Sequence, residues 1–367
     1  MHRTPEQRRQ LRADCDLIVP DFAPLSPAQE FQQLALWCEQ HGVEHDLYGD
    51  GKLVAGFEQK VGALLGKPAA VFMPSGVMAQ LVAVKIWAEA ARLPRFGMHA
   101  TSHLALHEDE AFAALLNCHG VLLGNRLRPL QAKDLEASRQ ALACVVIELP
   151  LREIGGQLPT WDELEQLKSA AQARGVPLHM DGARLWECAA WFGKTYVEIA
   201  TGFDSVYVSC YKGIGGLSGA VLAGSDDFIA QARLWRRRMG GTLHHLSPMV
   251  ASAAMRFDER LALMPALYQR ALELTAGLRP LPFLRVNPTP VHTNLFHLYF
   301  QAPAEVVMNA RDRLAVETRS WLVGNVRAAE VPGWSVTEIY VGDRLLGIDS
   351  ARVVALFARL GEMMLAV

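Results

Sequence analysis

The strongest constraint on this fold is an alternation of short apolar runs with longer amphipathic stretches between about residues 50 and 240. The short runs predict buried strands, and the stretches between them predict helices. The predicted strands are Ala69–Met73, Gly120–Leu123, Cys144–Leu149, Val176–Met180, Ser205–Cys210 and Ala220–Ala223. The predicted helices include Leu53–Leu65, Val77–Ala91, Leu135–Leu142, Trp161–Arg174 and Asp226–Arg238. This alternation favours an α/β fold with a mostly parallel sheet.

The length of 367 residues is enough for one large and one small domain. We expect residues 1–27 to form an N-terminal arm that docks elsewhere, and residues 28–247 to form the large domain. Residues 248–367 are expected to hold a linking helix and a smaller C-terminal α/β domain. The elements predicted there are a helix over Pro248–Leu274, a strand within Thr293–Tyr299 and a helix over Asp349–Met364.

Charge and cysteine content limit the classes of partner. The formal net charge is −2, which gives no electrostatic reason to bind nucleic acid or an acidic membrane. Six cysteines without a Cys-x-x-Cys pair are typical of reduced thiols. Residues 1–16 lack an apolar signal core, and no apolar run approaches the ~20 residues of a membrane helix. We therefore expect a cytoplasmic protein without a membrane span.

Two polar residues follow predicted strands and suggest a site. Asp181 ends the run Val176–Met180, and Lys212 lies 31 residues later, beyond Ser205–Cys210 and before three glycines. That spacing allows a strand–helix–strand excursion back to the same sheet edge, where α/β proteins bind ligands. Alone, the lysine would be read as solvated and the aspartate as a helix cap. Together they match pyridoxal phosphate (PLP) chemistry, which needs a lysine amine and a carboxylate beside the ring nitrogen.

Two further segments could complete such a site. Ser75, Gly76 and Val77 follow a predicted strand and begin a helix, whose backbone N–H groups suit a phosphate. By itself this segment would be an ordinary turn. His103 could stack on the ring and exchange protons with a substrate, although a structural role is equally consistent with it. For the neighbouring His107 we favour a structural role. His244 and His245 are adjacent, which is poor chelating geometry, and no metal site is expected.

These segments, taken in order, resemble the threonine aldolase / β-eliminating lyase family of fold-type I PLP-dependent enzymes. The similarity is collinear from about Asp46 to Gly241. It rests on Asp46-Leu-Tyr-Gly-Asp50, Ala70-Val-Phe-Met-Pro-Ser-Gly-Val-Met-Ala79, His103-Leu-Ala-Leu-His-Glu108, His179-Met-Asp-Gly-Ala-Arg-Leu185, Lys212-Gly213 and Trp235-Arg-Arg-Arg-Met-Gly-Gly241. The resemblance implies a large PLP-binding domain with a mostly parallel sheet and a smaller C-terminal domain.

The resemblance also implies a role for each matched residue. Lys212 would carry PLP as a Schiff base, Asp181 would pair with the ring nitrogen, and His103 would stack on the ring. Arg184 would contact the cofactor or the substrate carboxylate. Ser75, Gly76 and Val77 would bind the phosphate. Tyr48 would reach the phosphate of a neighbouring subunit, which requires a homodimer or homotetramer with shared sites.

Several positions depart from the family pattern. Val77 replaces a threonine, and Tyr211 replaces a small serine before the lysine. The family's Glu-Asn-Thr-His segment appears as Glu148-Leu149-Pro150-Leu151, which lacks the histidine expected near the substrate hydroxyl. Arg152 and Glu153 follow directly and are equally consistent with substrate contacts or with a simple turn. The cofactor half of the site is therefore kept, and the substrate half is altered.

The leading functional expectation is a PLP-dependent lyase that cleaves a small, threonine-like β-hydroxy amino acid to glycine and an aldehyde. In that reaction His103 is the best remaining base for the hydroxyl. The alternative is β-elimination, or another reaction that removes the Cα proton, on a different amino acid; the leucine at position 151 favours it. A PLP-binding protein without turnover is a third reading. No Gly-x-Gly-x-x-Gly follows the first strand, so a dinucleotide site is unsupported.

Overall fold

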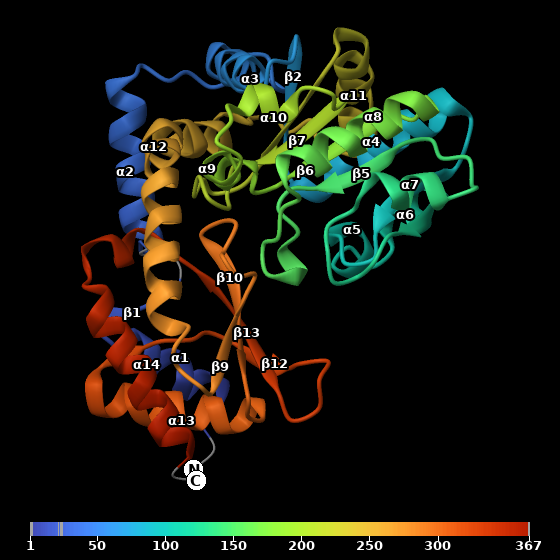
Figure 1. Cartoon of the computed structure of the whole chain (residues 1–367). Coiled ribbons are helices and arrows are strands. Elements are labelled where there is room, and N and C mark those ends of the chain that lie inside the picture. The colour runs from blue at the N-terminus through green and yellow to red at the C-terminus, as the bar shows by residue number, and fades with distance from the viewer. Residues whose placement is uncertain (1–2, 21, 23–24, 366–367) are drawn as a thin grey trace. The chain divides into compact units, whose positions relative to one another are not determined.

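The computed structural model describes residues 3–20, 22 and 25–365. The chain divides into two compact units (Figure 1). The larger unit comprises Leu25–Glu153 and Leu158–Ala262, and the smaller unit comprises Met1–Pro24, Ile154–Gln157 and Leu263–Val367. The chain passes from one unit to the other within the long helix α12 (Ser247–Leu278). The N-terminal segment is thus grouped by its contacts with the C-terminal part of the chain.

A central sheet organises the larger unit. Its strands lie in the order β2-β8-β7-β6-β5-β3-β4, and β8 alone among them runs against the others. The mostly parallel sheet predicted from the sequence is therefore confirmed. The strands are β2 (Ala69–Met73), β3 (Arg95–His99), β4 (His119–Leu123), β5 (Val145–Glu148), β6 (Leu178–Gly182), β7 (Ser205–Ser209) and β8 (Ala220–Gly224).

Helices cover this sheet with apolar faces. On one side, Val82 of α4 (Gly76–Ala91) and Ile229 of α11 (Asp226–Arg238) pack with Val71, Tyr207 and Leu222 of the strands. The predicted helix Leu135–Leu142 is wrong in position, because the observed helix α7 spans Ala132–Ala137. The other helices of the unit are α2 (Pro27–Gln40), α3 (Lys52–Leu64), α5 (His103–Leu106), α6 (Ala111–Leu116), α7 (Ala132–Ala137), η1 (Arg152–Ile154), α8 (Trp161–Arg174), η2 (Leu185–Glu187), α9 (Ala189–Phe192) and α10 (Tyr196–Ala200).

The position of α7 has a local cause. Gln131 and Asp134 exchange hydrogen bonds between side chain and backbone, which starts the helix at Ala132, and Arg128 holds the Asp134 carboxylate with two more. The helix ends at Ser138, whose backbone is extended. Leu142 is buried beyond the helix. The sequence pattern failed here because the apolar residues after Ser138 belong to the approach to β5.

The smaller unit is built on an antiparallel sheet in the order β12-β13-β10-β9. Phe296, Leu298 and Ile339 of this sheet pack with Leu314 and Phe357 of two helices in one buried cluster. The elements are β1 (Leu17–Ile18), β9 (Leu284–Asn287), β10 (Leu295–Phe300), α13 (Ala304–Thr318), β11 (Ser320–Trp321), β12 (Val326–Ala328), β13 (Ser335–Tyr340), η3 (Asp343–Gly347) and α14 (Ser350–Leu365).

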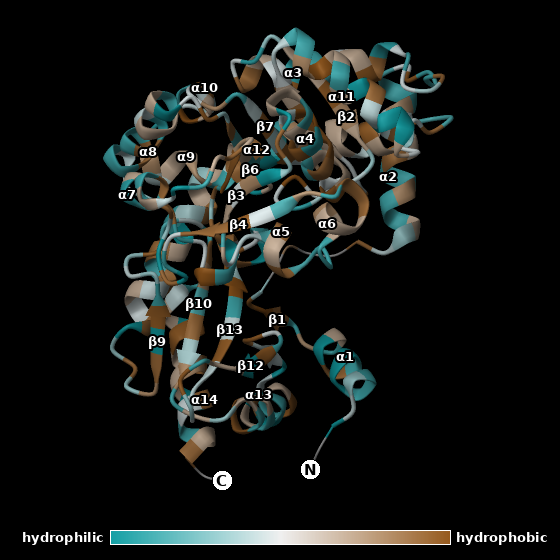
Figure 2. Ribbon diagram, turned by 90° about the vertical axis from the view of Figure 1, so that its right-hand side faces the viewer, coloured by the Kyte–Doolittle hydropathy of each residue, from teal (hydrophilic) through white to brown (hydrophobic). Residues whose placement is uncertain are grey.

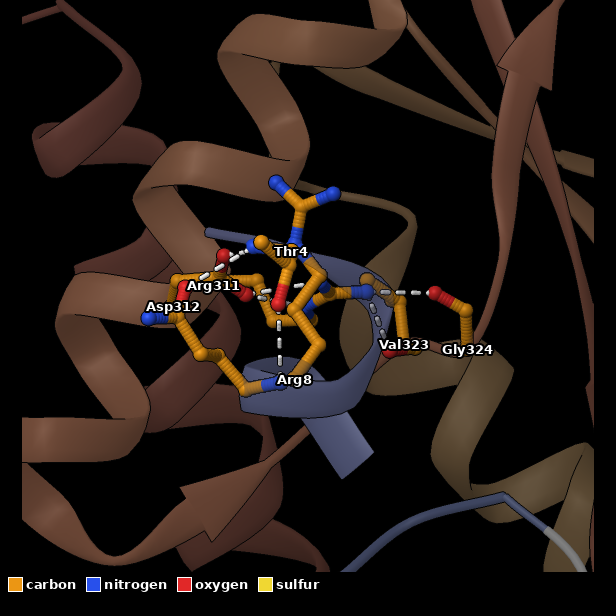
Figure 3. Close-up of polar contacts among 7 residues, drawn as sticks. Thr4, Arg8, Arg311, Asp312, Val323 and Gly324 are labelled. Atoms are coloured by element: carbon orange, nitrogen blue, oxygen red, sulfur yellow. Dashed lines mark hydrogen bonds and ion pairs between the residues drawn. The ribbon is translucent and has the colours of Figure 1, made fainter. Parts of the chain in front are cut away.

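The N-terminal helix α1 (Pro5–Ala13) docks within the smaller unit, and its polar sequence appears mostly teal in Figure 2. Arg8 donates through Nε to Oδ2 of the buried Asp312 at 2.8 Å (Figure 3). Arg311 donates to the other carboxylate oxygen at 3.0 Å and 2.6 Å, and to the Gly324 carbonyl at 2.6 Å. Removing one partner from such a buried ion pair typically costs about 3–5 kcal/mol. The contact therefore ties α1 to α13.

No helix among residues 3–20, 22 and 25–365 is long and apolar enough to cross a membrane. Over the same described residues, no cluster of three or more histidine, cysteine or acidic side chains is arranged to hold a metal ion. All six cysteines are free thiols, and five of them are buried.

Candidate active site

The two residues singled out at strand ends meet in the larger unit. Asp181 lies near the C-terminal end of β6, and Lys212 follows the parallel neighbour β7. Both side chains line one pocket. The pocket is lined by His103, His107, Glu148, Leu149, Pro150, Arg152, Glu153, Asp181, Ala183, Arg184 and Lys212. The structure thus brings together four residues predicted from the sequence, namely His103, Asp181, Arg184 and Lys212.

Lys212 is held in an environment that favours its neutral form. Burial lowers the pKa of its amine from the ordinary lysine value, and the nearby Arg184 guanidinium lowers it further. The carboxylates of Asp181 and Glu148 act in the opposite direction. A neutral amine is the nucleophilic form of lysine, so this position suits covalent attachment of an aldehyde.

A buried chain of hydrogen bonds orients Asp181. Its Oδ1 accepts from the Ala183 backbone at 3.1 Å, and its Oδ2 accepts from the Gln80 amide. Gln80 Oε1 lies 2.8 Å from His179 Nε2, and His179 Nδ1 lies 2.8 Å from Ser205 Oγ. Burial lowers the pKa of His179 to about 3, so this ring stays neutral at ordinary pH. The chain fixes the carboxylate without adding a competing charge.

Gln80 was missed in the sequence, although a signal was present. It is a polar residue on the otherwise apolar inner face of α4, four positions after Gly76, and it is almost fully buried. A buried polar side chain normally has hydrogen-bond partners, so an amide on such a face points to a polar group facing it. Here that group is Asp181.

Ser75, Gly76 and Val77 form the N-terminus of α4. Ser75 caps the helix, because its hydroxyl accepts from the Met78 backbone at 3.2 Å. A Cβ at position 76 would collide with the Tyr207 hydroxyl, so only glycine fits there. Val77 is 37% exposed. Ser218, which the sequence did not indicate, donates its hydroxyl to the Pro74 carbonyl at 2.8 Å and lies beside this turn.

The helix start has the chemistry of an anion site. Backbone N–H groups in the first turn of a helix have no partner within the helix, and the helix dipole favours negative charge there. The helix is 16 residues long, and Gly76 is buried against β7, whose C-terminal end leads to Lys212.

Two imidazoles line the pocket, and each is paired with a glutamate. His103 Nδ1 lies 2.9 Å from Glu108 Oε1, and His107 Nε2 lies 2.8 Å from Glu153 Oε1. Burial raises the pKa of Glu108, and the hydrogen bond with His103 only partly offsets this. The His103 ring is thus fixed by a carboxyl group that is itself hidden from water.

Glu148 connects the two segments that carry these rings. Its Oε2 accepts from the His103 backbone at 2.9 Å, and its Oε1 accepts from the Arg152 backbone at 3.2 Å. Burial, and then the nearby Asp181 charge, raise the pKa of Glu148 to about 7. The residue therefore acts as a tie between the two loops and carries a proton for part of the time near neutral pH.

Of the remaining positions singled out in the sequence, two lie outside the pocket lining, namely Leu151 and Tyr48. Leu151 is buried at 3% exposure and is absent from the pocket lining, whereas Arg152 and Glu153 do line it. Tyr48 also lies outside the lining, in a left-handed turn with φ 57° and with 56% of its surface exposed. Asp46 builds that turn by accepting from the backbones of Gly49, Leu246 and Ser247.

These residues fit bound PLP. The cofactor requires an amine for its aldehyde, a fixed carboxylate for its ring nitrogen and an anion site for its phosphate. Lys212, the oriented Asp181 and the tight turn at Gly76 offer these three groups within one unit. His103, at 32% side-chain exposure, supplies an imidazole in the same pocket.

Comparison with known proteins agrees with this arrangement. Residues 35–301 match the family model described as beta-eliminating lyase. The low-specificity L-threonine aldolase 1 of Arabidopsis thaliana is 26% identical over 268 residues, which cover 70% of this chain and 74% of the relative. The low specificity L-threonine aldolase of Escherichia coli (strain K12) is 27% identical over 248 residues, or 65% of this chain and 72% of the relative.

Solved structures match over nearly the whole chain. A Listeria monocytogenes EGD-E protein, provisionally assigned as an L-allo-threonine aldolase, is 34% identical with a TM-score of 0.90, covering 97% of this chain and 99% of its own. A protein from Exiguobacterium sp. 255-15, provisionally assigned as an aromatic amino acid beta-eliminating lyase/threonine aldolase, is 35% identical with a TM-score of 0.90 over 96% and 99% of the two chains.

The architecture is that of the fold-type I PLP-dependent enzymes, with a mostly parallel central sheet and a C-terminal domain. A Leishmania major threonine aldolase shares this fold at 19% identity with a TM-score of 0.72 over 95% of this chain and 99% of its own. Within that class, the chain belongs to the beta-eliminating lyase family.

Proposed function

We propose that this protein is a PLP-dependent carbon–carbon lyase that cleaves a small, threonine-like β-hydroxy amino acid to glycine and an aldehyde. The observation that carries the proposal is the convergence of Lys212, Asp181 and His103 on one pocket of a beta-eliminating lyase family member. The threonine aldolase names of its relatives support the choice of substrate class.

Each residue of the pocket has a role in this proposal. Lys212 holds PLP covalently, and its lowered pKa keeps the amine reactive. Asp181, oriented by Gln80 and the Ala183 backbone, keeps a proton on the ring nitrogen. His103 and Arg184 line the pocket; His103 would stack on the ring, and Arg184 would contact the cofactor or the substrate carboxylate. When bound, PLP accepts the electron pair that is released at Cα.

The cofactor phosphate is assigned to Ser75, Gly76 and Val77 at the start of α4. Ser75 and the backbone amides donate to it, and the absence of a Cβ at Gly76 lets the turn pack closely on Tyr207. Ser218 lies beside this turn and is a further candidate contact.

The assembly proposed is a homodimer or homotetramer in the cytoplasm. Tyr48 is exposed in a turn that Asp46 holds rigidly, which suits a side chain presented to the phosphate of another subunit. Mixing a Tyr48→Phe variant with a Lys212→Ala variant tests sharing. If sites are shared, a mixed assembly contains one site with both Tyr48 and Lys212 intact, so activity exceeds the weighted average of the two variants; independent subunits would give that weighted average at every mixing ratio.

The function is tested by the visible spectrum of the purified protein, followed by titration with L-threonine, L-allo-threonine and their D-isomers. We expect a visible band from the cofactor bound through Lys212, and release of acetaldehyde and glycine with at least one isomer. The Lys212→Ala variant should lose both. A band that shifts with amino acids without release of aldehyde would favour β-elimination or another Cα reaction, which the leucine in place of a histidine at position 151 also favours. No band after added PLP would overturn the cofactor assignment.

A further inference from the structure

The pocket has a second His–Glu pair, at its more exposed side, that the proposed function does not use. His107 follows α5, and Glu153 lies in the short helix η1. Their side chains are 37% and 17% exposed, and His107 Nε2 lies 2.8 Å from Glu153 Oε1. Arg152 Nη1 lies 3.4 Å from the same oxygen. All three residues line the pocket together with Lys212.

The pairing gives His107 the form of a base. A carboxylate only accepts hydrogen bonds, so His107 donates its Nε2–H to Glu153, and the lone pair then lies on Nδ1. His103 has the opposite arrangement, because its Nδ1 faces Glu108. The two ring centroids are 5.3 Å apart, so both imidazoles lie within reach of one small substrate.

The other bases of the pocket are already engaged. Both oxygens of Asp181 accept hydrogen bonds, and both oxygens of Glu148 accept from backbone amides. Lys212 is needed for the cofactor. Position 151, where the family pattern places a histidine near the substrate hydroxyl, holds a leucine that is buried and does not line the pocket.

We propose that His107 is the catalytic residue that takes the proton from the β-hydroxyl of the substrate, and that Glu153 is its positioning residue. This inference rests on the proposed function. It moves the hydroxyl step from His103 to His107 and leaves His103 to the cofactor ring.

The proposed step transfers one proton and breaks one carbon–carbon bond of the substrate. Nδ1 of His107 takes the hydroxyl proton, the Cβ–O bond becomes a carbonyl, and the Cα–Cβ bond breaks. The electron pair of that bond passes to Cα, where bound PLP delocalises it. Solvent supplies one proton to Cα to give glycine, and His107 releases the hydroxyl proton to solvent, so no net proton is gained or lost. No oxidant or reductant is consumed.

A comparison of two reactions of the holoenzyme tests the proposal. Release of aldehyde requires the hydroxyl base, whereas exchange of a glycine Cα proton with D₂O does not. For His107→Asn we expect aldehyde release from L-threonine and L-allo-threonine to fall by about 10²–10⁴-fold, the usual contribution of a general base. Glycine exchange and the visible band should stay unchanged. The matched control is His119→Asn, an exposed histidine of β4 outside the pocket, which should leave both reactions unchanged.

Glu153→Gln tests the positioning role. The amide can still accept the imidazole N–H but carries no charge, so we expect a smaller fall in kcat than for His107→Asn, with little change in KM. Nitrogen NMR of ¹⁵N-histidine-labelled protein gives a readout independent of turnover. The signal that is missing in His107→Asn should show a protonated Nε2 in the wild type, and the preference for this tautomer should weaken in Glu153→Gln.

Four outcomes overturn the inference. Equal loss of aldehyde release and glycine exchange in His107→Asn would show a general defect, and no loss in either reaction would show that the ring is idle. A wild-type His107 with its proton on Nδ1 would exclude the step as drawn. A wild type that exchanges glycine but releases no aldehyde would overturn the proposed function itself, and the inference with it, before any variant is compared.

Discussion

Two histidines line the pocket, one on the wall that we call inner and one on the wall that we call outer, and each pairs with a glutamate of different burial. On the inner wall, His103 pairs with Glu108, whose side chain is 1% exposed. On the outer wall, His107 pairs with Glu153, whose side chain is 17% exposed, and Arg152 reaches the same carboxylate. The inner wall also carries Asp181 and Lys212.

The two His–Glu pairs differ in electrostatic strength because their glutamates differ in burial. Electrostatic interactions are stronger where water is excluded, so the inner pair holds its ring in one position. The outer pair is more screened by solvent and easier to replace without disturbing the sheet. Changes on the inner wall should therefore affect every reaction of the cofactor, whereas changes on the outer wall should affect only the reaction that involves the substrate side chain.

Among substitutions that keep both Lys212 and His107, the largest effect is expected for Asp181→Ala on the inner wall. The ring nitrogen would lose the charge that keeps it protonated, so aldehyde release and glycine exchange should both fall by about 10²–10³-fold, as for loss of one preorganised electrostatic group. The cofactor should still bind through Lys212, with a visible band. Steady-state assays and the spectrum check this. Loss of only one of the two reactions would break the distinction between the walls.

Gln80→Leu should have the next largest effect. The change leaves His179 and one oxygen of Asp181 without their buried partner, at roughly 1–3 kcal/mol for an unsatisfied group. We expect a lower Tm and a fall in both reactions that is smaller than for Asp181→Ala. Gln172→Leu, on the exposed face of α8, is the matched control and should change neither. Equal behaviour of the two variants would mean that the buried chain does not orient Asp181.

Glu148→Gln should change how stability depends on pH. The pKa of Glu148 is raised from 4.5 to about 7, so the folded protein keeps a proton there that the unfolded chain has released. This contribution to stability is fully present below pH 4.5 and is lost as pH rises through about 7. Glutamine cannot ionise, so the variant should gain stability relative to the wild type between pH 5 and pH 8. Urea midpoints at both pH values check the sign; parallel changes would exclude a raised pKa.

The smallest effect is expected for Val77→Thr at the start of α4. Threonine has nearly the same shape and adds a hydroxyl beside the proposed phosphate site. One added hydrogen bond of about 0.5–1.5 kcal/mol should lower the Kd for PLP by roughly two- to tenfold. Quenching of tryptophan fluorescence on titration of the apoprotein measures this. Val197→Thr, also an exposed valine, should leave the Kd unchanged; an equal gain there would place the phosphate elsewhere.

Much of the fold could be predicted because its strands are short and apolar. Trp161–Arg174 and Asp226–Arg238 were placed at their observed bounds, since Thr160 and Ser225 are clear caps. Strand β3 was missed: Arg95-Phe-Gly-Met-His99 has charged or polar ends, a glycine and no β-branched residue. Its place in the sheet comes from pairing with β4 and β5, which local sequence does not encode.

Some residues of the candidate site could likewise be predicted from local sequence, and others could not. Asp181 and Lys212 were found because each follows an apolar run, so local pattern was enough. Gln80 and Glu148 were given no role, and His107 was interpreted as structural. Their contacts with Asp181, His103 and Glu153, respectively, span 101, 45 and 46 residues of sequence. Only folding brings these pairs together.

The pairing of β1 with β11 has a consequence for the order in which the protein is made. Leu17 and Ile18 align with Ser320 and Trp321, so a strand made before the larger unit pairs with a strand made after it. The larger unit is synthesised in between and can fold as soon as residue 262 has emerged. Throughout that interval Arg8 of α1 remains without Asp312. The smaller unit is therefore completed after the larger unit, and a chain released after residue 262 contains every residue of the Lys212 pocket.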